Sequence, residues 1–271
     1  MRRPLALAVL VLLALAGLTP AASADPPPDL AARQFSVMSF NIHHAAGPDG
    51  VSDLDRLAEE IRASGADVVG LQEVDRHFGA RSGFADQPAE LAARLGMHIV
   101  YGANLDLAPP APGAPRRQYG TAILSRFPIL SSANTFLPKG TSTEEQRGLL
   151  EAVLDVRGVP IRVMTTHLEA RRASSRLLQS QAVAELVRRS AEPVVLTGDL
   201  NGVPTAPEVT ELTALLADSH AAGDGDGFTF PVAVPRVRID YVLGEGRFLR
   251  SSVLPTAASD HRPVLARVLI G

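Results

Sequence analysis

The chain has 271 residues, of which 46% are hydrophobic, and its 29 acidic and 26 basic residues give a formal net charge of −3. This mild acidity argues against nonspecific coating of long nucleic acids, because such binding depends on many Lys and Arg contacts with phosphates. The absence of Cys excludes disulfides, so stability must come from a hydrophobic core, which a chain of this length can bury. We therefore expect one ordered domain.

The first residues have the three-part order of a secretory signal peptide. Two arginines precede an apolar run at 5–18, and Ala22-Ser23-Ala24 has the small-x-small form of a cleavage site. The run is short for a bilayer span of about 20 residues, which favours cleaved export over a membrane anchor. We expect a secreted, extracellular protein with no transmembrane segment in its mature form. The expected divisions are a signal peptide at 1–24, a Pro-rich leader at 25–34 and one domain at 35–271.

Apolar, β-rich runs alternate with a few helical ones along the rest of the chain. Several are nearly continuous in Val, Ile and Leu, as expected for strands that are covered on both faces. The pattern predicts strands at 35–42, 66–74, 119–124, 149–156, 161–168, 193–198, 238–243 and 263–270.

Helical spacing and turn residues complete the pattern. We predict helices at 53–63 and 174–189 and shorter ones at 87–95 and 207–217. In the helix at 174–189, the apolar face is expected to carry Leu178, Ala182 and Leu186. More strands than helices, with the helices distributed among the strands, indicates a layered α/β sandwich. Gly- and Pro-rich segments predict loops at 47–50, 108–115 and 223–227.

Polar residues interrupt the apolar runs at five places, each beside the end of a predicted strand. Functional groups commonly lie at strand ends in α/β scaffolds. Each of these polar residues alone has an ordinary explanation, since a lone Asp usually caps a turn and a lone His is usually structural. The set consists of Asn41, Glu73, His167, Asp199, Asn201, Asp240, Asp260 and His261.

Taken together, these side chains indicate a particular chemistry. Carboxylates and carboxamides without any Cys suit a hard cation such as Mg²⁺, Mn²⁺ or Ca²⁺ better than structural zinc. A hard cation beside acids and imidazoles is suited to phosphoryl chemistry. The cation neutralises charge on the phosphorus oxygens, a base orients water, and donors stabilise the developing oxyanion.

The motifs that carry these residues also occur in a recognisable order. They resemble the endonuclease/exonuclease/phosphatase superfamily, which includes deoxyribonucleases, neutral sphingomyelinases and inositol-polyphosphate phosphatases. The resemblance covers residues 35–270. It implies a catalytic domain built as a four-layer α/β sandwich, with two mixed β-sheets packed face to face and flanked by helices. The motifs are Ser-Phe-Asn-Ile, Leu-Gln-Glu-Val, Thr-His-Leu, Gly-Asp-Leu-Asn and Ser-Asp-His-Arg-Pro.

The resemblance implies that Glu73 is the principal ligand of a divalent metal, supported by Asn41 and Asp260. Mg²⁺ is the expected cofactor, with Mn²⁺ or Ca²⁺ as alternatives.

The same resemblance implies five catalytic residues. Asp199 would position or deprotonate the attacking water, and Asn201 would hold a phosphate oxygen. His261, oriented by Asp240, and His167 would both face the scissile phosphate.

Three further residues are expected to bind substrate. Arg147 precedes a predicted strand at a position where relatives often place a phosphate-binding residue. Tyr119 can line the cleft, although core packing is an alternative for it, and His44 follows Asn41 closely enough to border the site.

These features predict a secreted, metal-dependent hydrolase of phosphate esters that acts through in-line attack by metal-activated water. A phosphodiesterase or nuclease is the leading hypothesis, and a lipid phosphodiesterase similar to phospholipase C or sphingomyelinase is the alternative. A binding protein with inactive chemistry on the same fold is the third. The expected partner is nucleic acid, phospholipid or a small phosphodiester, and we expect a monomer.

Overall fold

The computed structural model describes residues 33–270, so the predicted signal peptide and most of the predicted leader lie outside the described residues. The strands form two mixed six-stranded sheets. None of the helices within 33–270 is long and apolar enough to cross a membrane.

The first sheet has the strand order β11-β12-β1-β2-β4-β3. Its strands are β1 (Gln34–Asn41), β2 (Val68–Arg76), β3 (His98–Leu107), β4 (Arg117–Ser125), β11 (Arg247–Val253) and β12 (Val264–Leu269).

The second sheet has the order β5-β6-β7-β8-β10-β9. Its strands are β5 (Ile129–Phe136), β6 (Gly148–Val156), β7 (Val159–His167), β8 (Val194–Asp199), β9 (Ala217–Asp218) and β10 (Asp240–Gly244).

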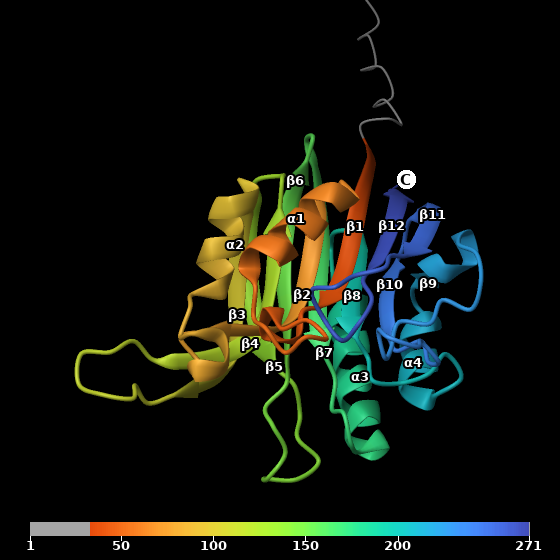
Figure 1. The fold of residues 1–271 in the computed structure, drawn as a ribbon. Helices are drawn as coiled ribbons and strands as arrows, with labels where there is room; N and C mark the ends of the chain where they lie inside the picture. Colours follow the sequence, from red (N-terminus) through yellow and green to blue (C-terminus); the bar gives the residue numbers. More distant parts are fainter. Residues whose placement is uncertain (1–32, 271) are drawn as a thin grey trace, which may run out of the picture.

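Four helices cover the sheets, and α1 and α2 lie across the face of the sheet that contains β1 and β2 (Figure 1). Asp53 caps α1 by accepting bonds from two backbone amides, and Gly65 ends it in the left-handed region. The helices are α1 (Leu54–Ser64), α2 (Gln87–Leu95), α3 (Ala173–Arg188) and α4 (Pro207–Thr213), and the short 3₁₀ turns are η2 (His43–Ala45), η3 (Ala80–Ser82) and η4 (Ser219–Ala222).

Alternating side chains of the central strands fill separate hydrophobic cores. In β1, Val37 packs between the two sheets, whereas its neighbour Met38 packs under α1 and α2. In β8, Val195 belongs to the core between the sheets and Leu196 to the core under α3 and α4. The order helix, sheet, sheet, helix is the four-layer sandwich that the resemblance implied, and the fold prediction is confirmed.

The site is positioned by the two parallel strand pairs, one in each sheet. β1 runs parallel to β2, and β7 runs parallel to β8. Because parallel neighbours end at the same edge of a sheet, the last residues of each pair lie side by side there. Asn41 is paired with Gln72 in the first sheet, and His167 is paired with Asp199 in the second. Antiparallel β10 begins at this edge with Asp240 opposite Asp199. The segment between β5 and β6 projects beyond the same edge (Figure 1).

The strand and helix predictions differ from the structure in three respects. Strands β3, β5, β9 and β11 were not predicted, and all four lie at the outer edges of the sheets. In the predicted apolar face of α3, Ala182 and Leu186 do pack against the core under α3 and α4. Leu178 is wrong, because it is 45% exposed, whereas Gln179 and Val183 are fully buried. The helix predicted at 207–217 ends at Thr213.

The two sheets approach each other closely at Gly70, two residues before Gln72. A Cβ at this position would lie 1.9 Å from Thr197 Oγ1 and 2.9 Å from Thr165 Oγ1. Gly70→Ala should therefore lower the free energy of unfolding by about 2 kcal/mol through overpacking. Urea denaturation would measure this loss. Gly79→Ala is the matched control, because an added Cβ there meets nothing within 4 Å; equal stability of the two variants would contradict the argument.

Candidate active site

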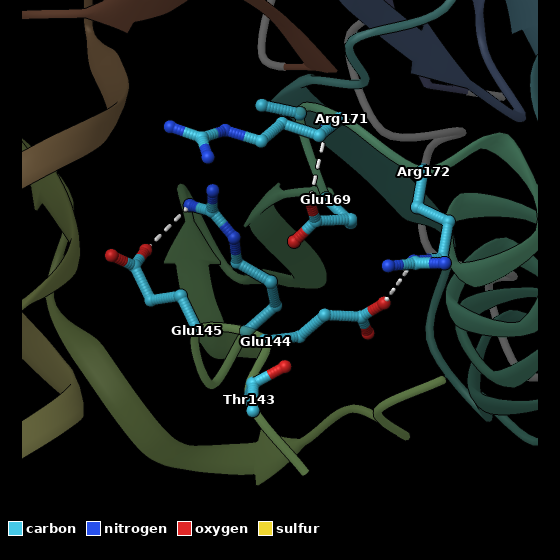
Figure 2. Close-up of a pocket in the computed structure, with 8 residues that line it drawn as sticks. Thr143, Glu144, Glu145, Glu169, Arg171 and Arg172 are labelled. Carbon is cyan, nitrogen blue, oxygen red and sulfur yellow. Dashed lines mark hydrogen bonds and ion pairs between the residues drawn. The ribbon is translucent and has the colours of Figure 1, made fainter. Parts of the chain in front are cut away.

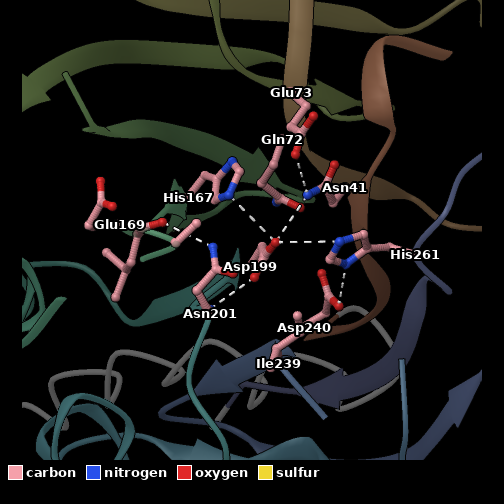
Figure 3. Close-up of polar contacts among 12 residues, drawn as sticks. Asn41, Gln72, Glu73, His167, Glu169, Asp199, Asn201, Ile239, Asp240 and His261 are labelled. Carbon is pink, nitrogen blue, oxygen red and sulfur yellow. Dashed lines mark hydrogen bonds and ion pairs between the residues drawn. The ribbon is translucent and has the colours of Figure 1, made fainter. Parts of the chain in front are cut away.

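Strand ends from both sheets bring seven of the predicted residues into one polar cluster, shown in Figure 3. Asp199, which is 1% exposed, lies at its centre. The members are Asn41 at the end of β1, Glu73 in β2, His167 at the end of β7, Asp199 at the end of β8, Asn201 just beyond it, Asp240 at the start of β10 and His261 before β12.

A β-bulge directs Glu73 into this cluster. The register between β2 and β4 shifts between Leu71 and Val74, and Glu73 has a φ of 60°, in the left-handed region. Bulges commonly redirect a side chain beside an active site. Asn41 Nδ2 donates to Glu73 Oε1 at 3.0 Å and to Asp199 Oδ2 at 3.0 Å, which links the carboxylates of the two sheets.

Asp199 accepts a hydrogen bond from a backbone amide and lies near two imidazole rings. Its Oδ1 accepts from the Asn201 backbone amide at 2.9 Å, while His167 Nε2 lies 3.6 Å and His261 Nε2 3.8 Å from its Oδ2. Burial and the neighbouring carboxylate of Asp240 raise the pKa of Asp199 to about 7. A carboxylate with such a pKa can accept a proton from water near neutral pH.

His261 and Asp240 form a buried pair in which Nδ1 of the imidazole lies 2.9 Å from Oδ2 of the carboxylate. Burial alone lowers the pKa of His261, but the charge and hydrogen bond of Asp240, with help from Asp199, raise it to about 10. The imidazole is therefore protonated at neutral pH. Ser259 fixes the segment, because its hydroxyl donates to the Asn41 carbonyl and accepts from the His261 amide.

His167 has the opposite charge state. Burial, with Arg147 and His261 nearby, holds the pKa of His167 well below its usual value, so this imidazole is neutral. Its Nδ1 is buried and has no hydrogen-bond partner within residues 33–270. Unpartnered buried polar atoms are rare, and one at a site is consistent with a ligand that is bound there in use.

Glu73 is the best placed carboxylate for a divalent cation. It is only partly buried, and ligand atoms of His43, His44 and Glu73 all lie within 4.8 Å of one another. Asp199, Asp240 and His261 form a second, buried group of this kind. In the second group, Asp240 and His261 are already paired with each other and Asp199 accepts from Asn41, so the donor chemistry favours Glu73. These residues fit the divalent metal that the sequence predicts.

Asp260 and His44, which were also predicted, border the cluster from the loop side. Asp260 Oδ1 lies 3.7 Å from His43 Nδ1. Burial, with Arg81 and His43 nearby, lowers the pKa of His44 to about 4, which keeps its ring neutral.

A charged pocket of about 710 Å³ adjoins the cluster on the side of His167. Figure 2 shows that each of its three Glu residues contacts an Arg residue. The pairs are Glu145 Oε1 with Arg147 Nη1 at 3.0 Å, Glu144 Oε1 with Arg172 Nε at 2.9 Å and Glu169 Oε1 with the Arg171 amide at 3.0 Å.

Of the two remaining predicted residues, Arg147 lines this pocket and Tyr119 does not. Arg147 is 7% exposed, and its Nε has no partner within the described part of the chain. Tyr119 is also buried, and burial, followed by the charge of Glu73, raises its pKa well above the usual value. Arg147 therefore lies between the pocket and His167, whose pKa its charge helps to lower, whereas Tyr119 packs against Phe78.

Three acidic residues that line this pocket were not predicted from the sequence. Glu145 precedes Arg147 by two residues and Glu169 follows His167 by two, so proximity in sequence was the available signal. Glu144 lies in a loop and had no such signal. Gln72 was quoted in a motif without a role; its Nε2 donates to Thr165 Oγ1 at 2.9 Å and bridges the two sheets under the site.

The chain is similar in sequence and in fold to known proteins. The chain is 31% identical to a crystal structure of an endonuclease/exonuclease/phosphatase from Beutenbergia cavernae DSM 12333, with a TM-score of 0.75 over 88% of this chain and 72% of that one. Protein YbhP of Escherichia coli strain K12 is 29% identical over 255 residues, which cover 86% of this chain and 96% of YbhP.

Protein cwh43 of Schizosaccharomyces pombe is 32% identical over 165 residues. The match covers 60% of this chain and spans only 16% of the length of that relative. The model of the endonuclease/exonuclease/phosphatase family matches residues 38–261. Since that match runs from β1 to the residue that pairs with Asp240, the chain belongs to the endonuclease/exonuclease/phosphatase family and has its metal-dependent phosphoesterase fold.

Proposed function

We propose that this chain is a phosphodiesterase that uses a divalent cation, Mg²⁺, Mn²⁺ or Ca²⁺, to hydrolyse a small phosphodiester with a polar leaving group. The observation that carries the proposal is the Asp199 cluster, in which a buried carboxylate faces one neutral and one protonated imidazole. The proposal includes secretion as a monomer after removal of residues 1–24, for which the signal pattern supports the export step.

The side chains divide the work of an in-line attack by water. Asp199, with its raised pKa, orients the water and accepts its proton. Asn201 donates one amide hydrogen to the Leu168 carbonyl at 3.1 Å, and its other amide hydrogen is proposed to hold a phosphate oxygen. A divalent cation bound at Glu73 would supply charge neutralisation on the non-bridging phosphate oxygens.

The two imidazoles have different tasks because their charges differ. Protonated His261, oriented by Asp240, donates from Nε2 to the phosphate and supplies a proton to the departing alkoxide. Neutral His167 donates from Nε2 towards Asp199, which leaves Nδ1 as an acceptor for a substrate hydroxyl or a water.

The charged pocket supports a small, polar substrate. Its lining consists of three Arg, three Glu, Thr143 and Ala170, so it offers hydrogen bonds in both directions. Nucleobases bind by stacking on aromatic rings, and acyl chains require apolar walls, neither of which this lining provides. A leaving group rich in hydroxyl or mixed charged groups is the best chemical match.

A lipid phosphodiester is the second candidate, favoured by a separate apolar feature. An apolar cavity of about 180 Å³ is lined by three residues of the β3–β4 loop and by His77 and Phe84, and Phe84 is 45% exposed. The β3–β4 loop projects far from the body of the protein (Figure 1). Exposed apolar groups on a projecting loop can insert into a membrane surface.

A substrate panel tests the proposal. It contains an aryl phosphodiester, an aryl phosphomonoester, duplex and single-stranded DNA, RNA, sphingomyelin vesicles and phosphatidylinositol vesicles. We expect turnover of the small diester that stops in EDTA, returns with added metal, and falls about 10³-fold in Glu73→Gln.

The matched control is Glu59→Gln, on the exposed side of α1, which should hydrolyse the diester as fast as wild type. Turnover that survives EDTA, or an unimpaired Glu73→Gln variant, would overturn the mechanism. Faster cleavage of vesicles than of the soluble diester would instead favour the lipid candidate.

A further inference from the structure

We propose that His43 and His44 are ligands of the cation at Glu73 and make the site prefer Mn²⁺ over Mg²⁺ and Ca²⁺. This rests on the proposed function only in that it takes Glu73 to be a cation ligand. Neither imidazole was predicted to bind a metal from the sequence, yet ligand atoms of these two residues and Glu73 lie within 4.8 Å of one another.

The backbone holds the two rings on the same side of a tight turn. His43, His44 and Ala45 have φ values of 44°, 46° and 63°, so three consecutive residues with side chains occupy the left-handed region. Residues with side chains rarely adopt this conformation, and it persists only where the surroundings enforce it. The His43 and His44 rings lie with their centroids 4.4 Å apart.

Hydrogen bonds from three parts of the chain enforce this turn. The His44 carbonyl accepts from Ser52 Oγ at 3.0 Å and from Gln87 Nε2 at 2.8 Å. The His43 amide donates to Asn41 Oδ1 at 3.1 Å, which connects the turn directly to the residue that contacts Glu73. Because Glu73 also has a positive φ, both sides of the group are held in uncommon backbone conformations that direct them towards each other.

The ring nitrogens have the partners expected of metal ligands. His43 Nδ1 faces the Ala46 carbonyl at 3.3 Å and the Asp260 carboxylate at 3.7 Å, which favours a proton on Nδ1 and a lone pair on Nε2. Metal-ligating imidazoles commonly donate their other N–H to a carbonyl or carboxylate in this way. His44 Nδ1 is buried and finds no partner in residues 33–270, so it is available to a ligand.

The donor set selects among cations. Mg²⁺ and Ca²⁺ prefer oxygen ligands throughout, whereas imidazole suits first-row transition ions. Among the three cations considered, Mn²⁺ is the one that accepts both carboxylate and imidazole ligands. Two imidazoles added to Glu73 and Asn41 therefore shift preference towards Mn²⁺ without excluding Mg²⁺.

Metal binding can be measured without substrate. Metal-free wild-type protein is titrated with Mn²⁺ and with Mg²⁺ by calorimetry, and Mn²⁺-loaded protein is examined by pulsed electron paramagnetic resonance for ¹⁴N coupling. We expect ¹⁴N coupling in wild type. In the double variant His43→Gln/His44→Gln, we expect its loss, a 10- to 100-fold weaker Mn²⁺ affinity and at most about a threefold change for Mg²⁺.

His98→Gln, an exposed imidazole on β3, is the matched control and should keep both the coupling and the affinities of wild type. Absence of ¹⁴N coupling in wild type would overturn the inference whether or not the double variant folds. Equal losses for Mn²⁺ and Mg²⁺ would do the same. Tight Mn²⁺ binding with ¹⁴N coupling but no phosphodiester turnover would leave the inference intact and reject the proposed function alone.

Discussion

Asp199→Asn should lower kcat/KM for the phosphodiester by about 10⁴-fold while leaving divalent-metal affinity within a few-fold of wild type. Asp199 Oδ2 accepts from Asn41 Nδ2 and faces Nε2 of His167 at 3.6 Å and Nε2 of His261 at 3.8 Å. A carboxamide there would lack the negative charge that faces these groups and could not take a proton from water. Metal affinity is expected to survive because the ligand group at Glu73 lies on the other sheet.

The pH dependence provides a second measure of this variant. Burial and Asp240 raise the pKa of Asp199 to about 7, so its ionised form is lost as pH falls through that value. The kcat/KM of wild type should therefore fall about tenfold per pH unit below the pKa, and this acidic limb should be missing from the residual activity of Asp199→Asn. Kinetics from pH 5 to pH 10 would measure both effects.

Asp67→Asn is the matched control, since Asp67 also accepts a backbone amide, from Ser36 at 2.8 Å, but lies before β2 at the opposite end of the sheet. It should retain wild-type kinetics. If Asp199→Asn kept more than a tenth of wild-type activity, Asp199 could not be the proton acceptor.

The strands that the sequence predicts are the interior strands of the two sheets. In β8 every residue is buried, and such a run is apolar enough to recognise without any structural context. In β5, at the edge of its sheet, most residues are exposed, and Ser131, Ser132 and Asn134 interrupt the apolar pattern. Edge strands are stabilised by pairing with a neighbour rather than by their own hydrophobicity, so single-sequence patterns miss them.

The helix α3 illustrates the same limit for side-chain orientation. Its inner face includes the buried polar residue Gln179, whose Oε1 accepts from the Glu169 amide at 2.8 Å and whose Nε2 donates to the Pro138 carbonyl at 3.2 Å. A polar residue that satisfies buried backbone groups belongs in the core, yet it blurs the helical hydrophobic period. The apolar Leu178 is exposed instead.

The candidate site divides along similar lines. Residues that end strands, such as His167 and Asp199, could be predicted because an acid or imidazole stands out after an apolar run. The bulge at Glu73 and the left-handed turn at His43 could not, since both depend on backbone conformations that these residue types rarely adopt. The pairing of Glu144 with Arg172 across the pocket joins separate loops and leaves no trace in local sequence.

Asp240→Asn should shift the basic limb of the pH–rate profile to lower pH by at least about two units and lower kcat/KM at pH 9 by about 10²-fold. Asp240 is the main reason that the pKa of His261 is raised to about 10, against the opposing effect of burial. Without the carboxylate, His261 loses its proton near or below neutral pH and cannot donate to the phosphate or the leaving group.

The free energy of unfolding provides an independent test, because the direction of its change with pH can be predicted. A folded-state pKa raised from 6.5 to about 10 means that the His261–Asp240 pair stabilises the fold fully below pH 6.5 and loses this contribution as pH rises through 10. Asp240→Asn should therefore lower the free energy of unfolding by about 3 kcal/mol at pH 6, with a smaller loss at pH 10.5. Urea denaturation at the two pH values would measure the difference.

A double-mutant cycle with His261→Gln separates the pair from its surroundings, because the coupling energy between residues 240 and 261 is their interaction alone. The coupling should be large at pH 6 and small at pH 10.5, whereas the cycle with exposed Asp106→Asn in place of Asp240→Asn should give none at either pH. A pH-independent coupling would mean that His261 is not a buried cation, and its proposed role as the proton donor would then be wrong. The pair would in that case be a neutral hydrogen bond that only orients the ring.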